Sequence, residues 1–404
     1  MALAVYVHIP YCLQRCRYCD FTTFEQSEIL PAPQYVQWLL QEIRQRRHLW
    51  TEDTLSTIYF GGGTPSLLTP DLIVSICQEL AKVGLRRSAD AEQTIEINPA
   101  TLDESKLNSY LEAGFNRFSV GAQTFDEALL KTCGRRHSAE DTRSTLRLLQ
   151  KYKANYSFDL LFALPGQTLQ GLARDLDEVL DFAPPHLSAY CLTVPTGHPM
   201  NQGRAPDSEQ VEMFDLIESR LKSIQLERYE ISNFARAGFE SRHNMAYWRD
   251  LPFWGLGLSA HSYNPSLGPW GSRFWNPKAM TEYERQVPNA GPHWKQVLAA
   301  DQIEELALHE SLTDFLHMHL RTQSGASTNA MKHKYPDSAL RVFTPRLEKT
   351  VRAGLVEVRK DQIRLTQKGV LLSNKVFEEF TFLAPDLLQR GTLTPAPRAP
   401  YCAL

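Results

Sequence analysis

The sequence predicts an α/β protein with a parallel sheet, and two observations support this class. Short apolar runs typical of buried strands alternate with longer amphipathic segments typical of helices. Six such strand-helix units follow one another, and parallel strands need crossovers of about a dozen residues or more between them. Because these crossovers are right-handed, consecutive units curl into a partial (β/α)6 barrel, with a flat doubly wound sheet as the alternative.

The order of the expected elements also locates a functional site. The expected strands cover residues 3–9, 55–61, 93–98, 117–123, 155–163 and 186–194. The expected helices cover residues 33–49, 70–83, 103–113, 138–153 and 168–182. In both folds ligands bind at the carboxyl ends of the strands, so the residues that follow each strand are the candidates for a site.

Composition describes a globular chain in a reducing compartment. The 404 residues are 43% hydrophobic, which is enough for a sizeable core in two or three domains. The 43 basic and 46 acidic residues give a net charge of −3, which argues against a general affinity for nucleic acid. Seven sparse cysteines are unlike a disulfide framework. No basic, apolar export signal precedes the first strand and no apolar run reaches about 18 residues, so we expect a cytoplasmic protein.

Three cysteines follow the first expected strand within one loop. Cys12, Cys16 and Cys19 have the spacing C-x3-C-x2-C, so their thiolates can reach one centre, and soft sulfur ligands select zinc or an iron-sulfur cluster. Three thiolates are one ligand too few for a closed zinc site or for a cubane cluster. Either a remote fourth ligand completes a structural metal site, which is the commoner use of clustered cysteines, or one coordination position is open for chemistry.

Glycines and acids follow the other expected strands. Residues 61–64, Gly-Gly-Gly-Thr, form a turn whose bare backbone can approach a ligand, although such a turn before a helix is more often only a turn. Glu96 is expected to face inward, and Asp159 lies inside an apolar run, where an acid is costly unless it is bonded. A carboxylate bonded to local backbone is the alternative for both acids.

The cysteine loop and the Gly-Gly-Gly-Thr-Pro turn together resemble the radical S-adenosylmethionine (SAM) enzymes. Over residues 5–265 the sequence resembles their oxygen-independent coproporphyrinogen oxidase-like branch. The resemblance implies that Cys12, Cys16 and Cys19 hold a [4Fe-4S] cluster whose fourth iron is chelated by SAM. It further implies SAM contacts from Tyr6 at the adenosine, Gly62, Gly63 and Thr64 at the amino end, Glu96, Gln123 and Asp159 at amino or ribose groups, Arg135 at the carboxylate and, more weakly, Thr193. Arg136 is the register alternative to Arg135, and His8 is expected to be a packed or capped histidine.

Two features separate the chain from the oxidases of that branch. Those enzymes have a fourth cysteine two residues after the third and an N-terminal extension, whereas this sequence has Phe21 there and begins eleven residues before Cys12.

Further along, His-Asn-Met-Ala-Tyr-Trp resembles the H-N-x-x-Y-W signature of the haem chaperone family HemW. This resemblance implies a haem site containing His243, Asn244, Tyr247 and Trp248. A histidine nitrogen is a good axial ligand for haem iron, while a buried, hydrogen-bonded histidine is the alternative on the residues alone.

The rest of the chain is expected to form a smaller domain. The expected division is barrel 1–235, haem-motif segment with an irregular linker or cap 236–296, winged-helix-like α+β domain 297–382 and disordered tail 383–404. The winged helix is predicted from helices near 299–321 and 337–353, a hairpin over 354–366 and a helix over 367–380. No basic recognition face accompanies these elements, so we expect a protein-contact or lid module without nucleic acid.

Three functions are open at this stage. The first is a haem chaperone that carries a [4Fe-4S] cluster and SAM and passes haem to respiratory proteins; a homodimer and peripheral membrane contact are further expectations for it. The second is an oxygen-independent coproporphyrinogen III oxidase that decarboxylates propionates. The third is a non-catalytic binding protein with a structural metal.

Overall fold

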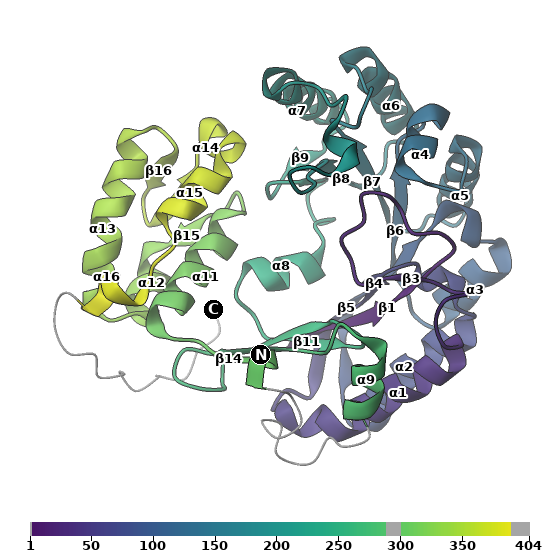
Figure 1. The fold of residues 1–404 in the computed structure, drawn as a ribbon, viewed down its shortest axis with the longest axis horizontal. Coiled ribbons are helices and arrows are strands. Elements are labelled where there is room, and N and C mark those ends of the chain that lie inside the picture. Colours follow the sequence, from purple (N-terminus) through teal and green to yellow (C-terminus); the bar gives the residue numbers. More distant parts are fainter. Residues whose placement is uncertain (1, 288–299, 389–404) are drawn as a thin grey trace.

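The computed structural model describes residues 2–287 and 300–388, and its centre is a curved parallel sheet (Figure 1). Six strands in chain order pair in parallel, each with the next, as the sequence predicted. They are β1 (Leu3–Ile9), β4 (Thr54–Gly62), β5 (Arg86–Ile97), β6 (Arg117–Gln123), β7 (Tyr156–Phe162) and β8 (His186–Cys191). The sheet is not closed, so the molecule is a partial (β/α)6 barrel.

Helices cover the convex face of this sheet and leave the concave face open (Figure 1). They are α1 (Ala32–Arg46), α2 (Pro70–Lys82), α3 (Glu104–Glu112), α4 (Glu127–Cys133), α5 (Ala139–Lys151), α6 (Leu169–Phe182) and α7 (Asp207–Lys222). Short 3-10 turns join some of them: η1 (Arg47–Leu49), η2 (Pro65–Leu67), η3 (Pro99–Thr101) and η4 (Pro199–Asn201). None of the helices in the described ranges is long and apolar enough to cross a membrane.

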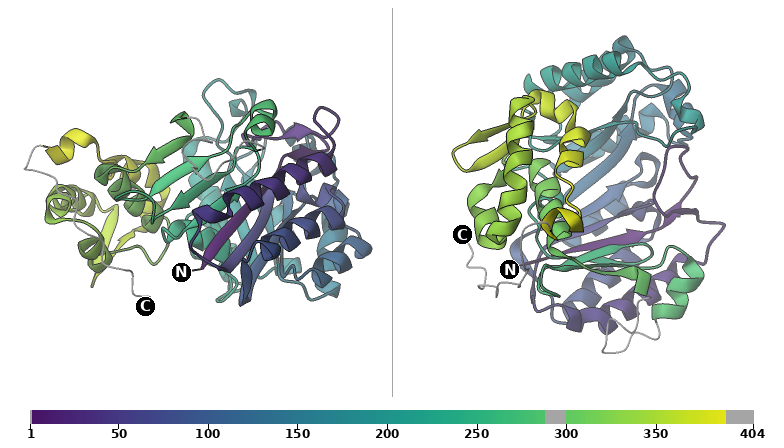
Figure 2. Two further views of the ribbon diagram at one scale, coloured as in Figure 1. Left: turned by 90° about the horizontal axis from the view of Figure 1, so that it is seen from below. Right: turned by 60° about the vertical axis from the view of Figure 1, so that its left-hand side comes forward.

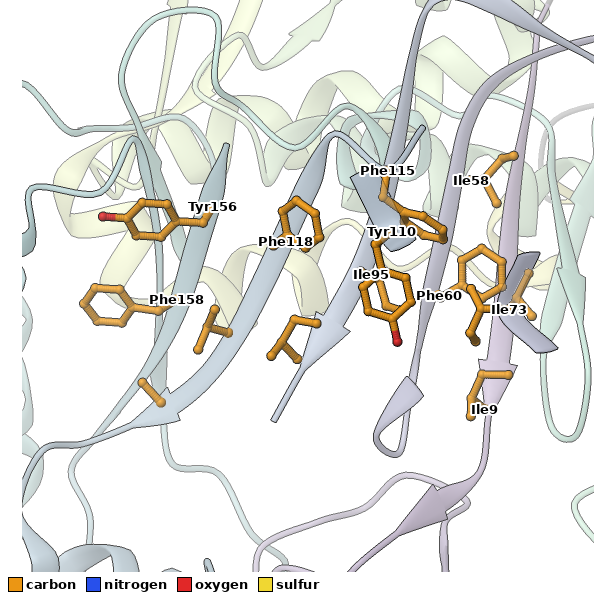
Figure 3. Packing of buried hydrophobic residues seen from close by; sticks show 14 of the residues in the cluster. Ile9, Ile58, Phe60, Ile73, Ile95, Tyr110, Phe115, Phe118, Tyr156 and Phe158 are labelled. Atoms are coloured by element: carbon orange, nitrogen blue, oxygen red, sulfur yellow. The ribbon is translucent and has the colours of Figure 1, made fainter. Parts of the chain in front are cut away.

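The core lies between the sheet and these helices. Successive side chains of a strand point to opposite faces, so every second residue meets the helices. Phe60, Ile95, Phe118 and Phe158 are fully buried on this outer face, and Figure 3 shows the layer along neighbouring strands. The residues beside them in sequence therefore point into the open side of the barrel.

The sheet continues beyond the six expected strands. On one side, β10 (Asn233–Ala235) and β9 (Glu227–Arg228) pair antiparallel beyond β8. On the other side, β11 (Phe253–Leu256) pairs in parallel with β1, and three antiparallel strands follow it. These are β12 (His261–Asn264), β13 (Ser272–Trp275) and β14 (Ile303–Glu305).

The irregular linker expected near the end of residues 236–296 was wrong at two places in the described residues. β13 and α9 (Met280–Gln286) are regular, while residues 288–296 lie outside the described ranges. A four-residue strand is too short to show a periodicity, and its stability comes from neighbours such as Trp50, whose ring lies 6.2 Å from that of Phe274. The helix expected from residue 299 begins later, because η6 (Ala300–Gln302) and β14 come first.

The C-terminal domain has the helices and small sheet of the expected winged-helix-like arrangement. Figure 2 shows it as a separate lobe beside the open side of the barrel. Its sheet has the order β15-β17-β16, and its own core includes Leu316, Phe343 and Phe380. Its elements are α11 (Leu308–Leu320), β15 (Ala326–Ser327), α12 (Thr328–Lys334), α13 (Asp337–Arg352), β16 (Val356–Arg359), β17 (Gln362–Leu365), α14 (Gln367–Leu371), α15 (Ser373–Glu379) and α16 (Ala384–Leu388). α16 lies in the expected disordered tail, so that expectation was wrong for its five residues; residues 389–404 lie outside the described ranges.

A buried carboxylate joins the first helix to the late strands. Glu42 of α1 is fully buried, and its Oε1 accepts hydrogen bonds from Arg46 and from Asn276, each at 2.7 Å. Its Oε2 accepts from the Gly257 N–H at 2.9 Å and from the Tyr283 hydroxyl at 2.6 Å. Residues more than two hundred positions apart in the chain are therefore joined by hydrogen bonds to one carboxylate.

We expect Glu42→Ala to lower the free energy of unfolding by about 3–5 kcal/mol, because it leaves the buried Arg46 guanidinium without a counter-charge. Urea denaturation followed by circular dichroism measures this. The control is Glu140→Ala, which removes an exposed ion pair with Arg147 and is expected to leave the urea midpoint unchanged. Equal midpoints for wild type and Glu42→Ala would contradict the expectation.

Candidate functional site

A cavity of about 350 Å³ lies at the carboxyl ends of the parallel strands, and we call it the first cavity. It brings together most of the predicted site residues from separate strands and loops, as expected for this fold. The predicted residues that line it are Cys12, Cys16, Cys19, Gly62, Gly63, Thr64, Glu96, Gln123, Arg135, Asp159 and Asn244.

The cysteine loop is held at the mouth of the first cavity by backbone pairing. β2 (Tyr11–Cys12) pairs with β3 (Phe24–Glu25), which brings the two ends of the loop together. The Arg17 N–H donates to the Cys133 carbonyl at 3.0 Å, which ties the loop to α4. Burial raises the pKa of the Cys12 thiol, and Arg135 Nη1 donates to Cys16 Sγ at 3.4 Å. A guanidinium therefore lies beside the Cys16 thiol.

The arrangement of the three thiols fits a multi-iron cluster. All three line one cavity, yet within the described ranges no three His, Cys, Asp or Glu side chains converge on a point the size of a single ion. A closed zinc site takes four ligands around one ion, and no such group was found in the described ranges. A [4Fe-4S] cluster takes its thiolates at separate irons, which suits ligands spread around a cavity.

Close packing explains why the turn that lines the cavity contains glycines. Gly62 has φ +108°, a conformation that favours glycine. A Cβ on Gly63 would lie 2.6 Å from the Tyr11 carbonyl oxygen and 2.8 Å from that of Ile9. The Gly63 N–H donates to the Ile9 carbonyl at 2.8 Å, so the turn is fixed against the end of β1. Its position beside the cysteine loop follows from this contact.

Two carboxyl groups face the first cavity, from β5 and from β7. Glu96 accepts a hydrogen bond from Tyr59 at 2.8 Å and from the Gly62 N–H at 3.1 Å, so the alternative of a carboxylate bonded to backbone also describes it. Burial, and then the charge of Asp159, raise the pKa of Glu96 to about 7. Burial also raises the pKa of Asp159 to about 6. The pair therefore favours a cationic or hydrogen-bonding ligand group between them.

The two arginines of the register alternative lie in different places. Arg135 lines the first cavity and donates from Nη2 to the Gly121 carbonyl at 2.6 Å. Arg136 is exposed, does not line the cavity, and donates from Nε to Gln14 Oε1 at 2.9 Å. Gln123 also lines the cavity, with φ +68°, a conformation uncommon for a residue with a side chain. Of these two arginines, Arg135 is thus the one whose side chain faces the first cavity.

Two predicted residues lie outside the first cavity. Thr193 is exposed, does not line it, and donates to the Cys191 carbonyl at 3.2 Å. Tyr6 lines a different cavity, and its hydroxyl shares a hydrogen bond with His8 Nδ1 at 3.1 Å. His8 Nε2 also bonds the Thr22 carbonyl at 2.9 Å, so the expectation of a packed, bonded histidine fits it.

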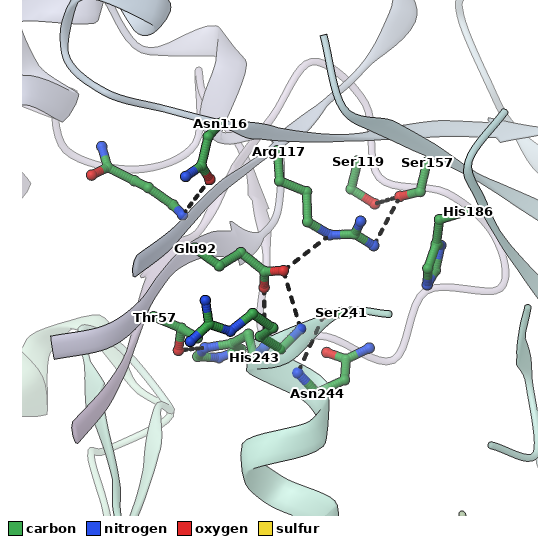
Figure 4. A network of polar contacts seen from close by, with 12 residues as sticks. Thr57, Glu92, Asn116, Arg117, Ser119, Ser157, His186, Ser241, His243 and Asn244 are labelled. Carbon is green, nitrogen blue, oxygen red and sulfur yellow. Dashed lines mark hydrogen bonds and ion pairs between the residues drawn. The ribbon is translucent and has the colours of Figure 1, made fainter. Parts of the chain in front are cut away.

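The predicted haem motif forms α8 (Arg242–Trp248), and its histidine is buried. Thr57 Oγ1 lies 2.7 Å from His243 Nδ1, and the Tyr247 hydroxyl lies 2.7 Å from Nε2. The N–H groups of residues 242 and 243 donate to the Glu92 carboxylate, as Figure 4 shows. Both ring nitrogens are engaged in this conformation, so the structure fits the packed-histidine interpretation and leaves no nitrogen of His243 for iron.

α8 separates the first cavity from a second one of about 520 Å³. Asn244 faces the first cavity, while Tyr247 and Trp248 face the second. Phe21, the residue in place of a fourth cysteine, lines both cavities and is 64% exposed. The motif residues therefore form a wall that the two cavities share.

Sequence reasoning missed Arg117 and His186, which line the first cavity. Arg117 is 3% exposed, its Nε lies 3.9 Å from Glu92, and its Nε and Nη1 have no hydrogen-bond partner within the described ranges (Figure 4). His186 is 1% exposed, and its Nδ1 likewise lacks a partner there. Arg117 could have been found from the sequence, because it is a charged residue at the start of a predicted buried strand.

The raised pKa of Glu96 predicts a pH dependence. A carboxyl whose pKa is about 7 when folded and 4.5 when unfolded binds its proton more tightly in the folded state. The free energy of unfolding is therefore expected to decrease as the pH rises from about 4.5 to 7. This group contributes on the order of 3 kcal/mol to the decrease. Glu96→Gln should flatten that slope in urea denaturation series, whereas the exposed Glu104→Gln should not. An unchanged slope in Glu96→Gln would contradict the expectation.

Comparison with known proteins agrees with this geometry. Residues 6–179 match the radical SAM superfamily and residues 306–372 match the HemN C-terminal domain. The heme chaperone HemW of Bacillus subtilis (strain 168) is 33% identical over 387 residues, which cover 93% of this chain and 98% of the relative. The HemW of Synechocystis sp. is 34% identical over 362 residues, which cover 78% of this chain and 85% of the relative.

A solved structure supports the fold over nearly the whole chain. The coproporphyrinogen III oxidase HemN from Escherichia coli, described as a radical SAM enzyme, superposes with a TM-score of 0.78 at 23% identity, covering 94% of this chain and 90% of that one. At this identity the likeness concerns the fold. The partial barrel, the three-cysteine loop, the matching C-terminal domain and the near full-length relatives show that the chain belongs to the HemW family of the radical SAM superfamily.

Proposed function

We propose that this protein is a cytoplasmic haem chaperone that binds haem, carries a [4Fe-4S] cluster and SAM, and delivers haem to haem-requiring respiratory proteins. The observation that carries the proposal is the position of α8, the segment with the H-N-x-x-Y-W pattern, as the wall between two cavities. One cavity holds the cysteines, and the other is lined by Tyr247 and Trp248. Relatives named as heme chaperones, similar along most of this chain, support the same function.

The first cavity supplies the groups that a cluster and SAM require. Cys12, Cys16 and Cys19 are the ligands for a [4Fe-4S] cluster, which when bound supplies one-electron reducing power to the SAM sulfonium. Arg135 pairs with the SAM carboxylate, because a planar guanidinium matches a carboxylate. Glu96 receives the amino group or a ribose hydroxyl. The remaining contacts are proposed for Gly62, Gly63, Thr64, Gln123 and Asp159, whereas Tyr6 of β1 and the exposed Thr193 do not line this cavity.

The second cavity supplies a surface for haem. Tyr247 and Trp248 present aromatic rings, which suit a flat apolar ligand. His243 contributes by holding Tyr247 through the hydrogen bond at 2.7 Å, and Asn244 connects the same helix to the first cavity. Asp314 and Met318 of α11 also line the second cavity, so the C-terminal domain completes it. A homodimer and peripheral contact with a membrane, where respiratory acceptors reside, complete the proposal.

Iron content tests the cluster assignment. We expect about four irons per chain after anaerobic reconstitution, and nearly none in Cys16→Ser, because a cluster held by two thiolates is not retained. Cys77→Ser is the matched control, since Cys77 lies on α2, accepts a hydrogen bond from Gln93, and does not line the cavity. One zinc per chain in place of iron would favour the binding protein with a structural metal.

Haem titration and an oxidase assay together test the function. Reconstituted protein is expected to bind haem saturably under anaerobic conditions, measured by absorption, and to form no protoporphyrinogen from coproporphyrinogen III with SAM and a reductant. Trp248→Ala should weaken haem binding because it removes part of the cavity wall. Decarboxylation without saturable haem binding would favour the coproporphyrinogen oxidase instead.

A further inference from the structure

The second cavity contains a histidine whose ring nitrogens have no hydrogen-bond partner among residues 2–287 and 300–388. His8 and His261 line this cavity and His243 adjoins it. Both nitrogens of His8 and of His243 take part in hydrogen bonds. By contrast, the ring of His261 makes no hydrogen bond to any residue in the described ranges; its only recorded ring contact is a stack on Trp275. His261 is thus the histidine at this cavity that has a nitrogen available to a ligand.

The fold presents His261 to the cavity in a defined orientation. His261 begins β12 and lies opposite Trp275 in the register of β13, with ring centroids 5.4 Å apart and planes 27° apart. Its backbone is fixed against β11, because a Cβ on Gly255 would lie 2.1 Å from the His261 carbonyl oxygen. The strand and the indole hold the imidazole, so it needs little reorganisation to bind a metal ion in a ligand.

The walls of the cavity suit a flat, largely apolar ligand. Phe21, Tyr247, Trp248 and Tyr263 line it, and its volume of about 520 Å³ falls within the roughly 300–1,000 Å³ typical of small-molecule sites. Aromatic rings favour stacking with another extended ring system. Met318, contributed by α11, adds a thioether, which is a second kind of axial ligand for haem iron.

A cation that has no ion-pair partner in the described part of the chain lies beside the histidine. Lys278 lines the cavity, is exposed, and makes no recorded ion pair or hydrogen bond within the described ranges. The other cation of the wall, Arg273, is already paired with Glu304 at 2.8 Å and with Asp314 at 3.0 Å. Partial desolvation of His261, and then the charges of Lys278 and Arg273, lower its pKa, so the ring is neutral at pH 7. A neutral imidazole is the form that binds iron.

We propose that haem binds in the second cavity with His261 as an axial ligand of its iron and Lys278 paired with a propionate. This inference rests on the proposed function, since it specifies the site of the same cargo. It also assigns His243 a positioning role through Tyr247 instead of iron ligation. Haem bound here contacts both the barrel and α11 of the C-terminal domain.

The test is an anaerobic haem titration of reconstituted full-length protein, followed by absorption and electron paramagnetic resonance spectra. His261→Ala is expected to change the spectrum of the bound haem and to weaken binding by about tenfold or more. Added imidazole should restore the wild-type spectrum, which a purely structural role would not predict. Lys278→Gln should weaken binding while leaving the iron spectrum unchanged. His333→Ala, on the exposed face of α12, is the matched control and should behave as wild type.

The outcomes separate this inference from the proposed function. Iron content equal to that of wild type confirms that each variant is folded. If wild type binds haem and His261→Ala and His261→Gln both keep its spectrum and affinity, the assignment of His261 is overturned while the haem chaperone proposal stands. If His243→Ala alone loses the iron spectrum, the ligand is His243. If wild type binds no haem at all, both the function and this inference are overturned.

Discussion

The site depends on the alternation of side chains along the parallel strands. In each of the pairs Tyr59 and Phe60, and Phe158 and Asp159, one residue packs beneath the helices and its neighbour faces the first cavity. A register shift of one residue would exchange the two sets. The apolar layer therefore fixes the polar positions, and the burial of large side chains such as Phe60 and Phe158 offsets the cost of enclosing carboxyl groups beside them.

The walls of both cavities also depend on the position of α8, which borders each of them. Its N-terminus is held by the Glu92 carboxylate, and that carboxylate also faces the guanidinium of Arg117 in the first cavity. Further along the same helix, His243 is bonded to Tyr247, which faces the second cavity. Any displacement of α8 therefore changes the walls of both cavities. The two cavities are therefore linked directly by one short helix.

Much of the fold and part of the site were predictable from the sequence. Six strands and their helices show clear periods, and the cysteine spacing and glycine turn are local patterns, so Cys12 and Gly63 needed no structure to be found. Arg135 was also named from the sequence with Arg136 as its alternative, and only the three-dimensional structure shows that Arg135 is the one that lines the cavity. The roles of His243 and His261 were also hidden, since only tertiary contacts show whether a ring nitrogen is free.

The position of β1 in the sheet has a consequence for the order of events during synthesis. β1 pairs with β4 on one side and with β11 on the other, and β11 lies about 250 residues later in the chain. Until residues 253–256 leave the ribosome, β1 has one unpaired edge, and the cysteine loop that follows it is attached to an incomplete sheet. Pairing across such a separation is slow because a large loop must close first. The cysteine loop of the nascent chain is therefore made well before the sheet that carries it is complete, and the open edge of β1 can pair with other chains during that interval.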